Sequence, residues 1–143
     1  MSGKIQDGND VKYVLNGDIT AFSPYNRAFK YSDVTGEVTL AGDGDTNFAG
    51  ILVAVQISRS SQSPYNVTAY DGDNVTLSKT GMFEVIANGA VKYGQAIGLA
   101  ANGTFKALPD YDTSPSLDLI VKKVGRAEGN AADGEVFIIN LRK

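Results

Sequence analysis

The sequence predicts a mainly β, single-domain fold of the β-barrel or β-tulip-like kind, with little helix. Glycine recurs at short intervals, apolar and polar residues alternate over brief segments, and turn sequences separate these segments at roughly 8–12 residues. Glycine supplies 16 of the 143 residues and interrupts nearly every stretch long enough for a stable helix. A chain of this length fits one domain with one core. We therefore expect a flexible N-terminal arm over residues 1–10 and a single β-rich domain over residues 11–143.

The N-terminal half contains two alternating segments and one continuous apolar run. Val11, Tyr13 and Leu15 share one face against Lys12 and Asn16, and apolar and polar side chains alternate over residues 74–78, which predicts two half-buried strands. Phe48–Ile57 is almost continuously apolar, which predicts a strand covered on both faces. This run is roughly half as long as a bilayer-spanning helix. We therefore expect a core strand here and no association with a membrane.

Six more segments are rich in β-branched or aromatic residues and predict strands. They are Thr35–Leu40, Gly81–Ala87, Gln95–Ala100, Thr104–Leu108, Asp118–Val124 and Glu135–Leu141, of which we expect the last to be central. Asn102-Gly103 predicts a type I′ hairpin, because both residues readily adopt a positive φ. We expect exposed loops at Ser58–Pro64 and Pro109–Pro115, and short helical turns at Ala90–Tyr93 and within Ala127–Ala132.

Composition argues against several classes of function. Thirteen basic against 16 acidic residues give a net charge of −3, without the basic stripe that binds nucleic acid. The chain has no cysteine, and it has no histidine to act as a general base or a nitrogen metal ligand. We therefore predict that the protein is not an enzyme and has no catalytic residues, cofactor or metal.

Two acidic patterns leave a catalytic or metal-binding alternative open. Aspartate and glycine cluster in residues 7–10, 43–45 and 71–74, which could hold calcium, but none has the layout of an EF-hand, and Asp-Gly sequences are typical of turns. A pair of glutamates could act as in a glycosidase. The candidates, Glu37, Glu84, Glu128 and Glu135, lie in different predicted elements, so we interpret them as solvated charges.

The C-terminal half resembles the phage head decoration proteins, the small capsid-cement proteins. The resemblance rests on Gly81–Val85, Gly89–Gly94, Gln95–Ala100, the turn at Asn102-Gly103, Val124–Glu128, the Asp133-Gly134 turn and the terminal strand Glu135–Leu141. It implies a β-barrel or β-tulip domain, often a homotrimer, that binds the major capsid protein between capsomers on the outer surface of the head. The N-terminus carries one large apolar residue after Met1, Ile5, and so lacks a signal-peptide core. We therefore expect assembly in the host cytoplasm and a final place on the virion capsid surface.

The polar arm Ser2–Asp10 is the first candidate for contact with the capsid. It could become ordered there and add a strand to an exposed sheet edge, although an ordinary frayed terminus is the simpler interpretation. The candidate contact residues are Lys4, Ile5, Asp7, Val11 and Tyr13. A rival function is a carbohydrate- or protein-binding, adhesin-like virion module that uses some of the seven tyrosines. A small trimeric β enzyme of the nucleotide-hydrolase type is a weaker rival, since its Gly-rich, Ser- and Arg-containing motifs are missing.

Overall fold

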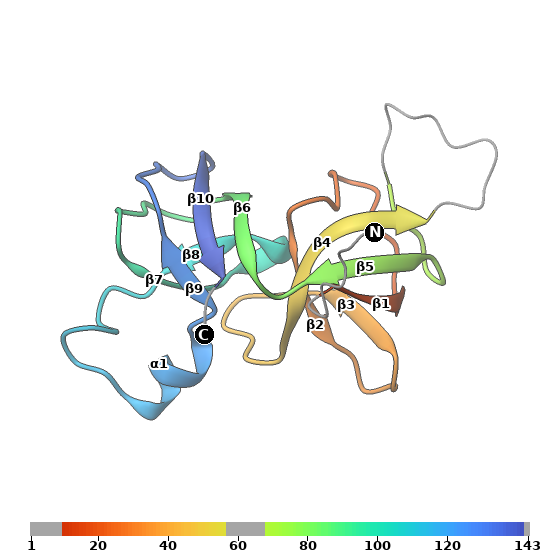
Figure 1. The fold of residues 1–143 in the computed structure, drawn as a ribbon, viewed down its shortest axis with the longest axis horizontal. Coiled ribbons are helices and arrows are strands. Elements are labelled where there is room, and N and C mark those ends of the chain that lie inside the picture. Colours follow the sequence, from red (N-terminus) through yellow and green to blue (C-terminus); the bar gives the residue numbers. More distant parts are fainter. Residues whose placement is uncertain (1–9, 57–67, 142–143) are drawn as a thin grey trace.

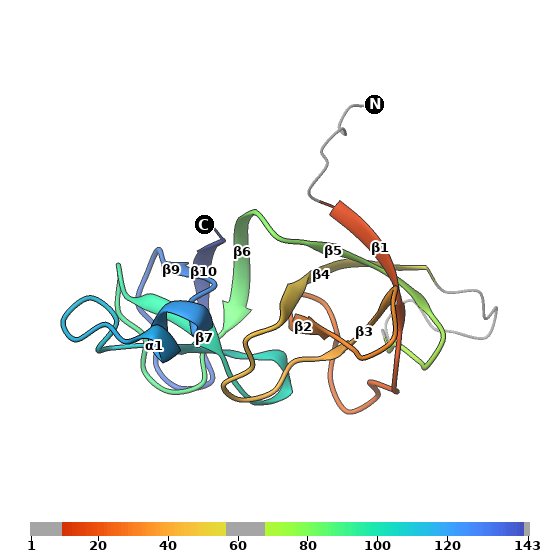
Figure 2. The ribbon, with the colours of Figure 1, turned by 90° about the horizontal axis from the view of Figure 1, so that it is seen from below.

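The computed structural model describes residues 10–56 and 68–141 and consists of two β units that lie side by side (Figures 1 and 2). The first unit is a closed five-stranded barrel with the strand order β1-β3-β2-β4-β5. Its strands are β1 (Asp10–Leu15), β2 (Ala28–Tyr31), β3 (Glu37–Leu40), β4 (Phe48–Gln56) and β5 (Asn74–Ser78). The prediction of a mainly β fold that contains a barrel is confirmed.

The second unit is a five-stranded sheet with the order β6-β10-β9-β7-β8. Its elements are β6 (Gly81–Ile86), β7 (Ala96–Leu99), the 3₁₀ turn η1 (Ala101–Gly103), β8 (Phe105–Ala107), α1 (Leu117–Lys122), β9 (Gly125–Ala127) and β10 (Val136–Leu141). A bridge between Ala87 and Phe105 brings the two outer strands together at one end. The C-terminal strand β10 lies between β6 and β9, as the prediction of a central strand required.

Strands β2 and β4 form the wall that the two units share. Ile51 packs into the core of the second unit, whereas the next residue, Leu52, packs inside the barrel. Ala28 and Phe29 on β2 divide in the same way. Successive side chains of a strand point to opposite faces. The continuous apolar run of β4 therefore reflects a strand covered on both faces here, although Ala54, near its other end, is exposed.

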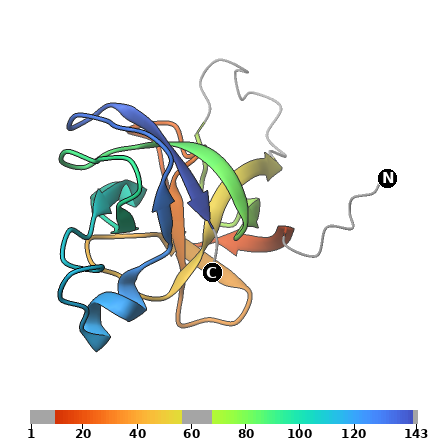
Figure 3. The same ribbon diagram turned by 60° about the vertical axis from the view of Figure 1, so that its left-hand side comes forward.

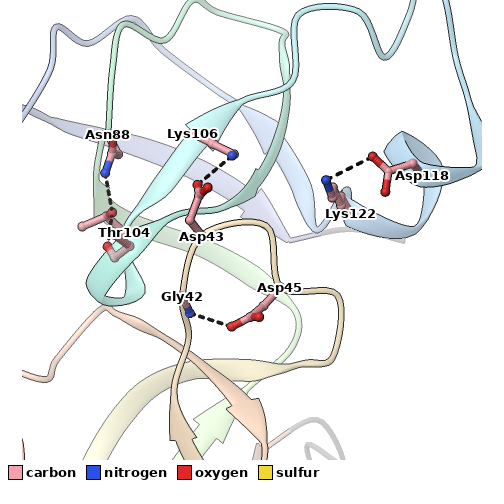
Figure 4. Close-up of polar contacts among 9 residues, drawn as sticks. Gly42, Asp43, Asp45, Asn88, Thr104, Lys106, Asp118 and Lys122 are labelled. Atoms are coloured by element: carbon pink, nitrogen blue, oxygen red, sulfur yellow. Dashed lines mark hydrogen bonds and ion pairs between the residues drawn. The ribbon is translucent and has the colours of Figure 1, made fainter.

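The loop between β3 and β4 fastens the barrel to the second unit (Figure 4). The Asp43 carboxylate accepts a hydrogen bond of 2.7 Å from the Lys106 ammonium group on β8. The Asp45 carboxylate accepts one of 2.7 Å from the backbone N–H of Gly42 and lies 3.1 Å from the Lys30 ammonium group. Both carboxylates of this Asp-Gly-Asp turn are thus held by protein groups.

The predicted hairpin at Asn102-Gly103 is confirmed. Asn102 has φ of 58° and Gly103 has φ of 72°. The Thr104 N–H donates to the Ala101 carbonyl over 3.2 Å, which closes the turn between the antiparallel strands β7 and β8. Two positive φ angles in succession are the signature of a type I′ turn.

The predicted strand at Asp118–Val124 is wrong, because this segment contains the helix α1. The Ser116 hydroxyl caps the helix by accepting from the Leu119 N–H over 3.3 Å. An ion pair of 3.0 Å joins Asp118 in the first turn to Lys122 in the last. Capping and charges at the favourable ends stabilise a helical turn. These local contacts override the strand preference of the β-branched side chains.

The two predicted helical turns are also wrong. Val91 and Ala131 exchange backbone hydrogen bonds of 2.8 and 2.9 Å, so both segments are extended and antiparallel here. Strands β2 and β9 were not predicted. The expected loop at Pro109–Pro115 is irregular and largely exposed, as predicted. The expected loop at Ser58–Pro64 and the arm up to residue 9 lie outside the described residues, while Asp10 already belongs to β1.

Candidate binding surface

Strand β1 extends beyond its neighbour β3 and leaves part of one edge open. It pairs with β5 from Asp10 to Val14, but with β3 only at Val14 and Leu15. Within the described residues, Asp10–Tyr13 therefore has a strand partner on one side alone. An unpaired strand edge presents N–H and C=O groups that can pair with another chain. Figure 3 shows β1 at the side of the barrel, leading from the N-terminus.

The hydrogen bonds of Val14 and Leu15 show which way the unpaired backbone N–H groups of β1 point. The Val14 N–H donates to the Gly36 carbonyl on the β3 side, and the Leu15 N–H donates to the Asp73 carbonyl on the β5 side. Backbone groups alternate along a strand, so the N–H of Lys12 points to the same side as that of Val14. Lys12 thus presents its N–H at the open edge.

Two of the predicted contact residues, Val11 and Tyr13, lie on this segment. Leu15 is buried, Tyr13 is partly buried, and Val11 is 43% exposed, so burial decreases toward the start of β1. The predicted strand at residues 11–15 is confirmed, but it is buried on its inner face only at Leu15 and partly at Tyr13. The other predicted contacts, Lys4, Ile5 and Asp7, lie outside the described residues.

An aromatic and cationic row continues from β1 across the barrel. The rings of Tyr13 and Tyr31 meet edge to face with centroids 6.0 Å apart. The Lys79 ammonium group lies 4.9 Å from the centroid of the Tyr31 ring. Burial, and secondarily a hydrogen bond with Tyr31, raises the pKa of Tyr13 to about 12. Both rings offer an apolar body with a polar tip, which suits a protein contact.

Several of the acidic residues, which are spread over the molecule, form structural contacts in turns. Asp71 accepts from the Gly17 N–H over 2.8 Å, and Asp73 accepts from the Tyr70 N–H over 2.9 Å, so the second Asp-Gly sequence is also a turn. Among residues 10–56 and 68–141, no three His, Cys, Asp or Glu side chains gather as metal ligands would. In the same residues, no helix is long and apolar enough to cross a membrane.

Sequence reasoning missed a set of exposed apolar residues in the second unit. They are Met82 on β6, Leu117, Ile120 and Val121 on α1, and Val136 and Ile138 on β10. A signal existed for β10, where Val136 and Ile138 alternate with the buried Phe137 and Ile139. Apolar residues on both faces of a strand indicate that both faces are covered, and no second cover lies over β10 in the part of the chain that the structure describes.

Comparison with known proteins supports the fold and identifies the family. The crystal structure of the N base of the head fiber protein gp8.5 from bacteriophage phi29 superimposes with a TM-score of 0.59, covering 93% of this chain and 92% of that chain at 14% identity. That level of identity supports the fold alone. No match was found among the curated proteins. The family model for structural cement proteins (E217 gp24/Pam3 gp6) matches residues 1–142. Because this match spans nearly the whole chain, the protein belongs to the phage structural cement family, whose members bind and stabilise the virion capsid.

Proposed function

We propose that this cement protein binds the outer surface of the head at sites between capsomers, as a homotrimer, and contacts the major capsid protein through β1 and the arm before it. The proposal includes assembly in the host cytoplasm and a purely structural role without catalysis. The chain has neither histidine nor cysteine, which is compatible with a role that consists of binding.

The observation that carries the proposal is the open edge of β1 at Asp10–Tyr13. A strand of the capsid can pair with such an edge, so that main-chain hydrogen bonds give affinity and alternate side chains give specificity. Val11 and Tyr13 are the side chains on β1 that meet this strand. Lys4, Ile5 and Asp7 precede β1 in the sequence, and we propose that they extend the same contact.

Binding between capsomers explains how the protein stabilises a shell. A ligand that binds the assembled state and not the separated subunits shifts the equilibrium toward the assembly by mass action. A trimer that contacts several subunits gains further through multivalency, because each additional contact forms at a high effective concentration.

The test uses purified protein and undecorated heads, with occupancy measured by cryo-electron microscopy. Lys12→Pro removes the N–H at the open edge, where proline is tolerated because that N–H is not needed by β5. Loss of one backbone hydrogen bond costs about 1–1.5 kcal/mol, so affinity for heads should fall roughly tenfold. Lys12→Ala is the matched control, since it removes the same charge but keeps the N–H.

Deletion of residues 2–9 should lower occupancy further than Lys12→Pro, because it removes the whole arm. Density between capsomers and loss of occupancy in both variants would support the proposal. Wild-type occupancy in both variants would exclude β1 and its arm from capsid binding, and bare shells with wild-type protein would contradict attachment to the outer surface.

A further inference from the structure

The outward side of β6, β10 and β9 carries an apolar strip with carboxylates on both sides, here called the acidic face (Met82, Glu84, Glu128, Val136 and Ile138). Ile138 lies directly opposite Glu84 on β6. On the other side, the Glu128 N–H donates to the Ile138 carbonyl over 2.7 Å, next to the Ile139–Ala127 pair. Neighbouring strands are about 4.8 Å apart. Two carboxylates therefore flank an isoleucine that is 42% exposed.

Neither carboxylate of the acidic face is neutralised within the described residues. Glu128 accepts a long hydrogen bond of 3.4 Å from the Asn140 amide, and neither Glu84 nor Glu128 forms an ion pair there. Met82 is 58% exposed, and Val136 is similarly exposed. The acidic face thus combines exposed apolar side chains with two unpaired negative charges.

A second apolar surface lies beside α1 and carries the opposite charge. It is a groove of about 370 Å³, here called the basic groove, whose lining includes Phe48, Lys79, Tyr111, Ile120, Val121 and Lys123. The Lys123 ammonium group lies 5.3 Å from the centroid of the Tyr111 ring, and that of Lys79 lies over Tyr31. Within the described residues, neither lysine forms an ion pair with a carboxylate.

The helix at this groove lies against β7, but its outward side is uncovered within residues 10–56 and 68–141. α1 has six residues, none of them buried, and Leu117 is 76% exposed. Isolated helices of this length are unstable in water, and most helices in proteins depend on the packing of an apolar face. The exposed apolar face of α1 therefore points to a partner that covers it.

Two lysines at the groove and two glutamates at the acidic face differ from the charged residues near them because they form no ion pair within the described residues. Near the groove, Lys122 pairs with Asp118 over 3.0 Å. Arg126 lies opposite Asn140, on the same side of β9 as Glu128, and pairs with Asp112 through two contacts of 2.9 Å. Among the described residues, neither Lys79 nor Lys123 forms such an ion pair, although Arg126 and, more weakly, Lys123 lower the pKa of the nearby Asp112 carboxyl. In that part of the chain, the groove thus offers two cations and the acidic face two anions that form no ion pair.

We propose that a second copy of this chain occupies the basic groove with its acidic face, in a head-to-tail contact. Ile138 and its apolar neighbours cover Ile120 and Val121, while Glu84 and Glu128 pair with Lys79 and Lys123. Figures 1 and 3 show α1 and the β6–β10 pair on different sides of the second unit, so one chain can use both surfaces at once. A contact between unlike surfaces repeats from copy to copy and closes into a ring when the rotation permits.

This inference deepens the homotrimer in the proposed function by naming the surfaces through which copies meet. Apolar burial supplies the affinity, and complementary charges select the orientation and the partner. The acidic face of a copy repels the acidic face of another, so a symmetric face-to-face pair is disfavoured. The capsid is the alternative occupant of the groove, and the test below separates the two.

The test measures the mass of the full-length protein by sedimentation velocity without heads, over about 1–100 μM, where micromolar contacts saturate. Wild type should associate. Lys79→Glu/Lys123→Glu makes both surfaces acidic, and Glu84→Lys/Glu128→Lys makes both basic. Each double variant should weaken self-association by about a hundredfold or more, because like charges then face one another.

The quadruple variant that combines all four changes is the decisive measurement. Its groove is acidic and its face is basic, so it should recover the wild-type mass. Two changes lower the net charge by four and two raise it by four, which returns it to the wild-type −3. Recovery therefore cannot come from net charge. Lys92→Glu and Asp33→Lys, at exposed positions that belong to neither surface as defined above, should leave the mass unchanged.

Mixing the two double variants should also produce complexes, because the acidic groove of one accepts the basic face of the other. The inference is overturned if wild type is monomeric throughout the range, if the double variants associate as wild type does, or if the quadruple variant stays dissociated. In a separate assay with undecorated heads, loss of head binding by a groove variant that associates normally would assign the groove to the capsid and likewise overturn the inference. Because the sedimentation measurement contains no heads, its result is independent of the Lys12→Pro test of capsid binding.

Discussion

The barrel and the second unit differ in how far each depends on the other. The barrel core draws only on residues up to Leu77. The core of the second unit includes Ala28, Ala41 and Ile51, which the barrel supplies. Among the described residues, the barrel therefore completes its core from its own strands and the loops between them, whereas the second unit needs residues of the barrel, chiefly on the shared wall of β2 and β4. Two units in contact therefore need not contribute equally to each other's stability.

The same two regions offer different chemistry to a partner. At β1 the barrel presents backbone groups of Asp10–Tyr13 that lack a strand partner on one side among the described residues. The second unit presents apolar side chains on β10 and α1, next to unpaired charges. Backbone edges accept many sequences, whereas side-chain patches select by shape and charge. We therefore propose capsid contact for the barrel, and contact between copies chiefly for the second unit.

We expect the largest loss of stability when one buried aromatic ring is removed from each core in turn. Phe29→Ala in the barrel and Phe105→Ala in the second unit each remove a fully buried ring and should lower the free energy of unfolding by about 3–5 kcal/mol. Phe29→Ala should also speed amide hydrogen exchange throughout the second unit, because it disturbs the shared wall. Phe105→Ala should speed exchange mainly within the second unit. Equal loss of protection in both units from both variants would contradict the one-directional dependence.

A smaller effect is expected from glycines at close strand contacts. A Cβ at Gly125 on β9 would collide with the backbone carbonyl of Asn140 on β10. A Cβ at Gly50 on β4 would lie 2.9 Å from the Ser78 carbonyl oxygen, and its φ is +145°. Each change to alanine should cost about 1–3 kcal/mol in urea unfolding, since the neighbouring backbone must move.

Gly129→Ala is the matched control for the two close-contact glycines. Nothing lies within 4 Å of its Cβ position, and its φ is outside the left-handed region. The change should alter stability by less than about 0.5 kcal/mol. A loss at Gly129 as large as that at Gly125 would mean that helix and strand propensities, and not the close contact, determine the cost.

The strands that sequence predicts correctly are those with a local signal. Alternation identified the core of β5, and Asn102-Gly103 identified the turn between β7 and β8 because both residues accept a positive φ. Strands β2 and β9 contain four and three residues, which is too short for any periodicity to show. They become strands because long-range neighbours pair with them. At α1 the end contacts of Ser116 and Asp118 prevailed over strand propensity.

The candidate surfaces were only partly predictable for the same reason. Val11 and Tyr13 were identified from their position next to the arm, but the open edge of β1 depends on where β3 begins. Likewise, Glu84 and Glu128 flank Ile138 only because of the registers of β6 and β9 against β10. Pairing register is a tertiary property, since it is set by burial of the opposite face.

The smallest expected effect is a difference between the two units in how their stability responds to alkaline pH. The pKa of Tyr13 is raised from 10.0 to about 12, first by burial and then by its hydrogen bond with Tyr31. A raised pKa in the folded state means that folding favours the neutral phenol. The resulting stabilisation is complete below pH 10 and is lost as the pH rises toward 12. Absorbance titration of tyrosinate should therefore show a late-titrating group that is lost in Tyr13→Phe.

Tyr31→Phe should lower the pKa of Tyr13 toward its ordinary value without abolishing the late titration, because burial, the larger cause, remains. In the wild type, amide exchange in β1, which carries Tyr13 and is not part of the shared wall, should accelerate between pH 10 and 12 beyond the intrinsic increase, and strands β6–β10 should follow later. Tyr13→Phe should remove this difference in timing. An identical pH dependence in wild type and Tyr13→Phe would show that the phenol is not stabilised by the fold, and the contact between Tyr13 and Tyr31 would then contribute through ring packing alone.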